Sequence, residues 1–500
     1  MRFDFWPGIF TTIFLAVLCL SGQAAEFENQ GDGDPVYQFR VKTGQGTLSR
    51  TKALLRVEGT LKTRSDTEQK PGKSEQGQIL DTPLRVTAKL YYDERVLQCS
   101  SACDWADKTV RYYYTAEAEV KVGQKQNDVV LPADRRVIVQ DLTEEAAFYS
   151  PSGPLERDQL DLIRVPGNTT AMSGLLPQKP ISEGEVWEVD DEALTAWLAL
   201  KSLGHSKVQG QWISTSGNYA TLRLSGNLAG VLEGTTTEIE LIIKCRYNMK
   251  KQHISSMVMD LKEERKASHA RPGLDIVARL QLRAAPITSS QPLADRYLDR
   301  LDLADRRQAH VLAFQSKAGK FTLLQDLRWH VTYDQDKTTV FRMVDGDKFL
   351  AQCNITRLPD LPSGTQLQLE AFQQNIHQAL GDYFGKFVVA KQHRTESGMD
   401  LIHVVATGLV EKLPIQWTYY HLTHQDGRRV VYTITLESEL QEQFSQADQL
   451  LVDSFQFSAK SPSSKIPTSA KQQKPTEVGQ QNQKDLTLSD QRGSYSQTQR

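Results

Sequence analysis

Apolar and polar residues alternate with a period of two over most of residues 36–285. The clearest alternating runs are 52–61, 84–92, 109–122, 219–228 and 237–247. Successive side chains of a strand point to opposite faces, so this alternation predicts strands with one buried face, most simply paired as antiparallel neighbours. Long strands of this kind tend to curl, and we therefore expect a half-barrel or a sandwich.

Two parts of this β region, residues 36–165 and 205–285, share an order of strand, glycine bend and long strand. The matching segments are Leu55-Arg-Val-Glu-Gly-Thr-Leu61 with Leu222-Arg-Leu-Ser-Gly-Asn-Leu228, and residues 82–93 with 237–248. Self-similarity of this kind predicts a duplicated β unit. The alternative is that any two amphipathic strands share such a pattern. However, the shared glycine and the shared Lys-x-x-Tyr are similarities that alternation alone does not explain.

Residues 190–203 break the alternation and predict a helix that connects the two halves and covers the β layer. Asp190 or Asp191 is suited to the N-cap, and Gly204 is suited to end the helix. Farther on, residues 286–320 begin with a polar segment that contains prolines and serines. This segment predicts an interdomain linker with a charged helix.

Residues 321–457 combine two periodicities and predict a separate α/β domain. Alternating runs indicate strands, whereas residues 366–384 and 439–453 carry apolar positions at helical spacing. Strands paired as a meander with a helix near each end imply an antiparallel sheet with helices packed on it. Together with the β region, this predicts an α+β fold class.

Several features of residues 321–457 resemble the PsbP-like α/β fold. They are Phe321-Thr-Leu-Leu-Gln-Asp-Leu-Arg-Trp329, the mid-domain helix, Gly408 with Pro414-Ile-Gln-Trp-Thr-Tyr-Tyr420, and the segment from Phe444 to Phe455. The resemblance implies a small binding or assembly module rather than a catalyst. The β region looks like the curved-sheet envelope carriers of the LolA type, on architecture alone. Neither resemblance transfers a functional residue.

The two ends of the chain differ from its body. An apolar run from Ile9 to Leu20 is followed by mostly small residues at 21–25, a pattern that predicts a signal peptide over residues 1–25. A retained N-terminal anchor is the alternative. Export to the periplasm or the extracellular space is therefore expected, and no later stretch approaches the ~18 apolar residues of a membrane span. Residues 26–35 and the polar tail 458–500 are predicted to be disordered.

The charge balance and the cysteines narrow the picture further. Lys and Arg number 59 against 61 Asp and Glu, so no global basic field exists to attract nucleic acid. Cys99 and Cys103 would close a small disulfide loop in an oxidising compartment. A zinc half-site is the rival interpretation, but no second Cys/His pair stands at finger-like spacing.

Histidines and aromatic residues supply the site hypotheses for the last domain. His403 lies in one predicted strand and His421 at the end of a neighbouring one, a placement that would bring them within metal-binding range. Half-buried histidines at sheet edges are the alternative. Trp417, Tyr419 and Tyr420 would line a groove for sugar or peptide, although strand aromatics more often belong to the core.

These patterns favour an exported non-catalytic binding or scaffold protein of the cell envelope, whose partner is an unknown protein or an apolar ligand. A hydrophobic cavity in the concave sheet would favour a carrier over a scaffold. The alternative class is a secreted hydrolase with a site assembled from distant residues. The sequence contains no Gly-x-Ser-x-Gly elbow and no His-Glu-x-x-His motif, and it predicts no cofactor.

Overall fold

The structure is a computed structural model. It describes residues 36–64, 79–99, 105–143, 147–232, 235–267, 272–346 and 348–458. The predicted signal peptide over 1–25, the segment 26–35 and residues 459–500 of the predicted tail lie outside the described residues.

An antiparallel sheet of 13 strands accounts for most of residues 48–286. Its order is β6-β5-β3-β2-β1-β14-β13-β12-β11-β10-β8, with β4 on β3 and β9 on β11. The strands are β1 (Leu48–Arg64), β2 (Ile79–Gln98), β3 (Lys108–Val122), β4 (Lys125–Val130), β5 (Val137–Asp141), β6 (Ala147–Tyr149), β8 (Val186–Glu188), β9 (Ser202–Ser206), β10 (Gln209–Ser216), β11 (Tyr219–Leu232), β12 (Thr235–Asn248), β13 (His253–Arg265) and β14 (Gly273–Pro286). The antiparallel β structure predicted here is confirmed.

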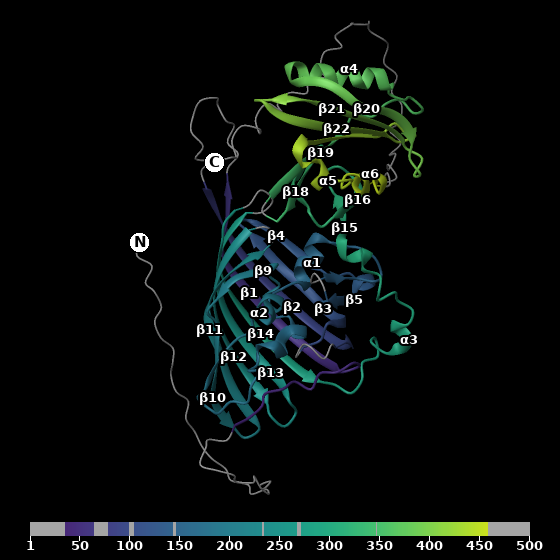
Figure 1. The fold of residues 1–500 in the computed structure, drawn as a ribbon. Coiled ribbons are helices and arrows are strands. Elements are labelled where there is room, and N and C mark those ends of the chain that lie inside the picture. Colours follow the sequence, from purple (N-terminus) through teal and green to yellow (C-terminus); the bar gives the residue numbers. More distant parts are fainter. Residues whose placement is uncertain are drawn as a thin grey trace, which may run out of the picture. The chain divides into compact units, whose positions relative to one another are not determined.

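The alternation read from the sequence is the burial pattern of these strands. In β12, every second residue from Ile239 to Tyr247 is buried on the inner face, and the residues between them are exposed. The two halves of the sheet meet where β1 pairs with β14, a contact between the start and the end of the β region. Figure 1 shows the long strands curving around the short helices of the region.

The glycine bends of the two proposed repeats share a backbone feature. A Cβ on Gly59 would lie 2.1 Å from the Asp275 carbonyl oxygen, and one on Gly226 would lie 2.1 Å from that of Lys207. Both positions therefore exclude any larger residue. The strand pairings differ, however, because Gly59 faces Leu84 whereas Gly226 faces Leu241, two residues beyond the position expected from the alignment. Duplication stays a prediction.

Short helices between β6 and β9 cover the inner face of the sheet. They are α1 (Arg157–Ile163), η2 (Thr169–Leu175) and α2 (Asp191–Leu198). The Asp190 side chain caps α2 by accepting a hydrogen bond from the Ala193 N–H at 2.8 Å, as the sequence predicts. The predicted helix 190–203 is too long. Ala199 adopts a left-handed conformation (φ 57°) that ends the helix, and the chain then pairs as β9 with β11.

The predicted linker and its charged helix are also revised. Residues 286–320 contain only a one-turn α3 (Asp295–Leu298), η3 (Arg306–His310) and β15 (Val311–Ser316). Leu293, Leu298 and Ala309 are buried against the apolar side chains of β3, β5 and β6, so the segment packs on the sheet. Burial of these apolar residues on the sheet stabilises the segment, whereas a short isolated helix is only marginally stable in water.

The remaining strands form two smaller sheets. A four-stranded sheet has the order β24-β16-β15-β7, with β7 (Leu155–Glu156), β16 (Phe321–Asp326) and β24 (Gln456–Phe457). A seven-stranded antiparallel sheet has the order β17-β18-β19-β23-β22-β21-β20. Its strands are β17 (Trp329–Gln335), β18 (Thr338–Asp345), β19 (Lys348–Leu358), β20 (Phe384–Arg394), β21 (Asp400–Val410), β22 (Leu413–Thr423) and β23 (Arg429–Glu437).

Helices cover both faces of the seven-stranded sheet. One face packs against α4 (Leu369–Leu380) and the other against α5 (Gln441–Phe444) and α6 (Gln449–Asp453). The chain is thus mostly antiparallel β in several sheets, and the predicted α+β class fits loosely because the helices are few and short.

Candidate functional site

The two candidate metal-binding histidines lie on opposite faces of the seven-stranded sheet. The β21–β22 register pairs His403 with Tyr420, and it pairs His421 with Ile402. The His403 ring stacks on Tyr420 at 4.4 Å between centroids, whereas His421 lies 5.4 Å from the Phe372 ring of α4. The structure therefore does not bring His403 and His421 together, since neighbours in a strand alternate between faces.

Both imidazoles are uncharged at neutral pH. Burial lowers the pKa of His403 and that of His421 to about 4. The Nε2 atom of each is buried without a hydrogen-bond partner among the described residues. Within the same part of the chain, no group of three or more His, Cys, Asp and Glu side chains could hold a metal ion.

The three candidate groove aromatics are divided between the same two faces. Trp417 and Tyr419 point to the α4 side, where Tyr419 lies 6.4 Å from Phe372. Tyr420 points to the other side, and its hydroxyl donates to the Asp448 carboxylate at 2.6 Å. The three side chains therefore do not line one groove; Trp417 and Tyr420 are buried in separate layers.

The predicted disulfide lies partly outside the described residues, because Cys103 is not among them. Cys245 and Cys353 are buried free thiols, and burial raises the pKa of Cys245 to about 12. A thiol with a raised pKa is a poor nucleophile and a poor metal ligand. Cys245 is therefore a packing residue of the hydrophobic core.

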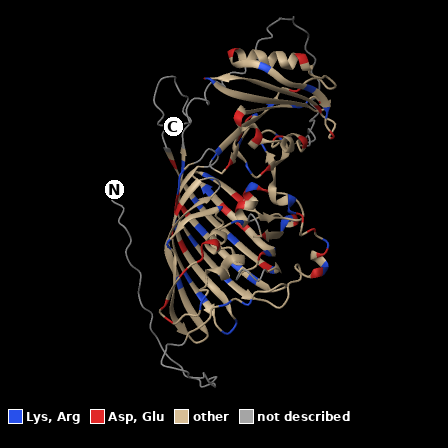
Figure 2. Cartoon of the chain, in the orientation of Figure 1, with Lys and Arg blue, Asp and Glu red and all other residues tan. Residues whose placement is uncertain are grey.

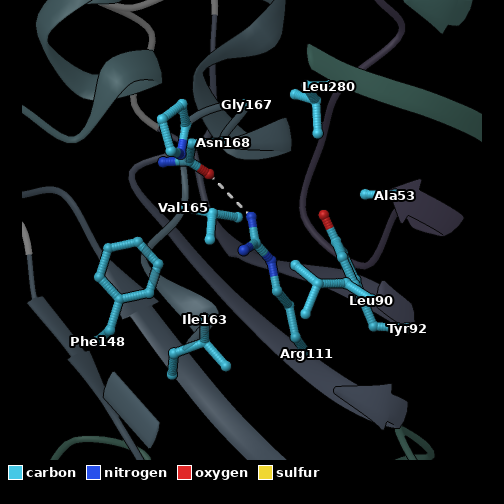
Figure 3. Close-up of a pocket in the computed structure, with 11 residues that line it drawn as sticks. Ala53, Leu90, Tyr92, Arg111, Phe148, Ile163, Val165, Gly167, Asn168 and Leu280 are labelled. Atoms are coloured by element: carbon cyan, nitrogen blue, oxygen red, sulfur yellow. Dashed lines mark hydrogen bonds between the residues drawn. The ribbon is translucent and has the colours of Figure 1, made fainter. Parts of the chain in front are cut away.

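The interior of the β region holds a small cavity beside Arg111 (Figure 3). Its volume is about 10 Å³. Apolar side chains of β1, β2 and β14 and the segment before η2 surround it. A space of this size is at the lower limit for one water molecule, so it does not admit a ligand.

Arg111 is buried and fully partnered. Its Nε donates to Glu94 at 2.6 Å, and its Nη2 donates to Asn168 Oδ1 at 2.8 Å and to the Thr169 hydroxyl at 3.0 Å. The guanidinium also lies 4.8 Å from the Tyr92 ring centroid. These contacts tie β2 and β3 to η2. A buried ion pair of this kind, with every partner supplied by the chain, is a structural feature.

The larger opening is on the outer face of the 13-stranded sheet. We call it the basic hollow; its volume is about 400 Å³, and it is lined by Arg50, Lys52, Tyr219, Asn248, Lys251, His253, Ser255, Arg283, Ala284 and Ala285. The lining comes from β1, β11, β13, β14, the end of β12 and the turn after it. Four Lys and Arg side chains contribute, and no carboxylate does.

One of these cations is held in place by the protein itself. The Arg50 guanidinium donates two hydrogen bonds to Asp93, at 2.7 and 3.0 Å, and the Tyr114 hydroxyl donates to the same carboxylate at 2.8 Å. Burial opposes ionisation of Asp93, but these hydrogen bonds hold the pKa of its carboxyl below its ordinary value. Arg50 is therefore fixed and largely neutralised.

The other cations have no such partner. Lys52 lies directly across the β1–β14 register from Arg283, and no carboxylate among the described residues forms an ion pair with either or with Lys251. Elsewhere on the outer face, cations are paired with acids, as in Lys62–Asp275 (3.5 Å) and Arg279–Asp260 (2.9 Å). Figure 2 shows how Lys, Arg, Asp and Glu are distributed along these strands.

Sequence reasoning missed the basic hollow because its residues are spread from Arg50 to Ala285. The available signal was weak: outward positions of the alternating runs around Lys52 and Arg283 carry cations without nearby acids. Only the β1–β14 pairing places these two runs side by side.

No family model matches this chain, and no curated protein matches it either. Among solved structures, the PsbP protein of the cyanobacterium Synechocystis is similar at 15% identity and a TM-score of 0.24, over 30% of this chain and 93% of that one. Kievitone hydratase of Nectria haematococca matches at 9% identity and a TM-score of 0.13, over 81% of this chain and 94% of that one. The outer membrane protein OprD of Pseudomonas aeruginosa matches at 9% identity and a TM-score of 0.11, over 80% and 96%.

The predicted likeness to PsbP is thus a weak structural resemblance over part of the chain. Scores of this size carry no argument about function. In the described part of the chain, no helix is both long enough and apolar enough to cross a membrane.

Proposed function

We propose that this chain is an exported, non-catalytic binding protein that recognises an anionic ligand in the basic hollow. The observation that carries the proposal is the lining of this opening, which has about 400 Å³, four Lys and Arg side chains and no carboxylate. Pockets for small ligands commonly have about 300–1,000 Å³. A concavity with charges of one sign raises the local concentration of the opposite ion.

The filled interior favours this proposal over a carrier of an apolar ligand. A carrier needs an apolar cavity, whereas the inner face of the sheet is covered by Leu175, Leu194 and Trp197 of η2 and α2. The cavity beside Arg111 has only about 10 Å³. The basic hollow, in contrast, is open to solvent, and most of its lining residues are polar or charged.

Export, the half-barrel architecture and the LolA-like character of the curved sheet belong to the same proposal. The leader-like sequence of residues 1–25 supports export. The strong curvature of the 13-stranded sheet supports a half-barrel (Figure 1). The hydrolase alternative gains no support from His403 and His421, since they lie on opposite faces of their sheet.

Isothermal titration of the full exported chain with inorganic phosphate, pyrophosphate and citrate tests the proposal. At least one of these anions is expected to bind saturably. Its affinity is expected to fall with added salt, because the Debye length shrinks from about 30 Å at 0.01 M to about 10 Å at 0.1 M ionic strength. If none of the three binds, the proposal is wrong.

The carrier alternative has its own test. The purified chain is extracted with organic solvent, and the extract is analysed by mass spectrometry. We expect no stoichiometric lipid, because the interior is filled by the chain's own side chains. Recovery of one lipid per chain would favour the carrier and contradict our interpretation of the interior.

A further inference from the structure

A pair of like charges lines the basic hollow. Lys52 on β1 is the direct cross-strand partner of Arg283 on β14. Like charges directly opposite one another in an antiparallel pair destabilise the sheet. Neither side chain has a carboxylate partner among the described residues, although Lys52 lies 4.9 Å from the Tyr91 ring centroid.

A second like-charge pair in the same two strands shows how the chain resolves such repulsion elsewhere. Arg56 faces Arg279 in the β1–β14 register, and Arg279 pairs with Asp260 of β13 at 2.9 Å. In the corresponding place beside Arg283, β13 presents Ser256 rather than an acid. The pair of Lys52 and Arg283 therefore lacks the counter-charge that its neighbour has.

A third uncompensated cation lines the same opening. Lys251 lies in the turn between β12 and β13 and lines the basic hollow together with Lys52 and Arg283. Arg50, the fourth, is neutralised by Asp93. Three cations with no acid among them match a ligand group that carries two negative charges better than one that carries a single charge.

We infer that the basic hollow binds the dianionic phosphate of a phosphate monoester, with Lys52 and Arg283 on either side of the phosphate group. This inference rests on the proposed function and specifies its ligand class. The Arg283 guanidinium offers a planar fork that fits two phosphate oxygens, and the Lys52 ammonium adds a point charge. The anion supplies the counter-charge that β13 does not.

The remainder of the hollow is suited to a polar body that carries the phosphate. The opening of about 400 Å³ is larger than a phosphate group needs. Asn248 is fixed there by accepting a hydrogen bond from the Lys251 backbone N–H at 2.8 Å. The Ser255 hydroxyl donates to the Arg246 carbonyl at 3.0 Å, so its oxygen remains an acceptor for a ligand hydroxyl. A sugar or another hydroxyl-rich group fits these partners.

The test compares glucose 6-phosphate with glucose 6-sulfate, which differ in the charge of one group, by isothermal titration of the full chain near neutral pH. The phosphate is expected to bind about tenfold or more tightly, equivalent to about 1.4 kcal/mol. Equal affinity for the two esters would overturn the inference. The proposed function would still stand if citrate or pyrophosphate binds, so the two failures are distinguishable.

A double variant and its matched control locate the binding. Lys52→Gln/Arg283→Gln is expected to weaken glucose 6-phosphate binding about tenfold or more. Lys62→Gln/Arg85→Gln removes the same charge from the same face, about 20 to 33 Å away along the strands. This control is expected to change the affinity less than twofold. Equal losses in both variants would show a general charge effect and contradict the inference.

Thermal unfolding checks the double variant independently of affinity. Glucose 6-phosphate is expected to raise the unfolding temperature of the unmodified chain more than that of Lys52→Gln/Arg283→Gln at the same ligand concentration. The same rise in both would place the ligand elsewhere. A folded double variant is expected, because the substitutions remove a repulsion at exposed positions.

Vesicle flotation separates a soluble monoester from one borne by a lipid. Vesicles with phosphatidic acid, a monoester, are compared with vesicles containing phosphatidylglycerol, a diester, at equal total negative charge. Binding to phosphatidic acid alone, or to glucose 6-phosphate alone, supports the monoester and identifies its source. Equal binding to both vesicles, with no preference between the two glucose esters, would overturn it.

Discussion

Two groups of cations in the same β region differ in how they are compensated. Inside, Arg111 is buried and satisfied by Glu94, Asn168 and Thr169. On the outer face, Lys52 and Arg283 are directly opposed and have no carboxylate partner among the described residues. A charge that the chain compensates itself stabilises the fold, whereas a charge that it leaves open is available to a ligand. The comparison thus separates a structural site from the proposed binding site.

The largest expected effect on stability comes from substituting the buried cation, Arg111. Arg111→Met leaves Glu94 buried and unpaired, and it is expected to lower the free energy of unfolding by about 3–5 kcal/mol in urea denaturation. Arg85→Met, an exposed position on β2, serves as the control and is expected to change it by less than about 0.5 kcal/mol. A small loss at Arg111 would mean that the interior cation is as dispensable as a surface one.

A second substitution sharpens the interpretation of that interior result. Arg111→Met combined with Glu94→Leu removes both charges, and apolar replacements of a buried ion pair are often neutral or stabilising. Most of the stability lost in Arg111→Met is therefore expected to return. No recovery would show that the hydrogen bonds to Asn168 and Thr169 matter more than the ion pair.

A buried imidazole, His421, whose Nε2 has no hydrogen-bond partner among the described residues, is expected to have an intermediate effect that depends on pH. Burial lowers the pKa of His421 to about 4, below its unfolded value near 6.5. The folded state then holds this imidazole neutral while the unfolded state takes up a proton. The stability that this group contributes is present above pH 6.5, and it is lost as the pH falls through 4.

His421→Leu is expected to reduce the acid-induced loss of stability between pH 6.5 and 4 by up to about 3 kcal/mol. Urea denaturation at several pH values measures this slope. His393→Leu, at an exposed position on β20, is the matched control and is expected to leave the slope unchanged. Equal slopes in the unmodified chain and His421→Leu would mean that the imidazole is solvated in the folded state.

The smallest expected effect on stability comes from substituting an exposed cation on the outer face, Lys52. Lys52→Gln relieves the repulsion with Arg283 and is expected to stabilise the ligand-free chain by about 0.5 kcal/mol. The gain is expected to shrink at high salt, because exposed charges are screened. A loss of stability in Lys52→Gln would indicate that the contact with Tyr91 outweighs the repulsion.

The strands were largely predictable from the sequence, because one-sided burial leaves a period of two. The run from Thr237 to Tyr247 shows this, since its predicted inward residues are the buried ones in β12. Helix ends were less predictable. The helix predicted to reach residue 203 stops at Leu198, because pairing of residues 202–206 with β11 competes with helix formation.

The candidate sites depended on register, which alternation cannot give. His403 and His421 were predicted to meet because they lie on neighbouring strands, but the register assigns them to opposite faces. A shift of one residue exchanges the faces, so adjacency of strands is not adjacency of side chains. For the same reason, Tyr420 lies on the face of the sheet opposite to Trp417 and Tyr419.

By itself, the sequence determined that the body of this protein is mostly β and which side chains of each strand face inward. These properties follow from local periodicity, because residues two positions apart in a strand point to the same face and are buried or exposed together. Only the tertiary structure decided that Lys52 faces Arg283 across more than 200 residues of chain. It also decided that Arg111 is enclosed by Glu94 and Asn168. Such contacts depend on which strands pair and in which register. The periodicity of a single strand does not indicate which strand it pairs with.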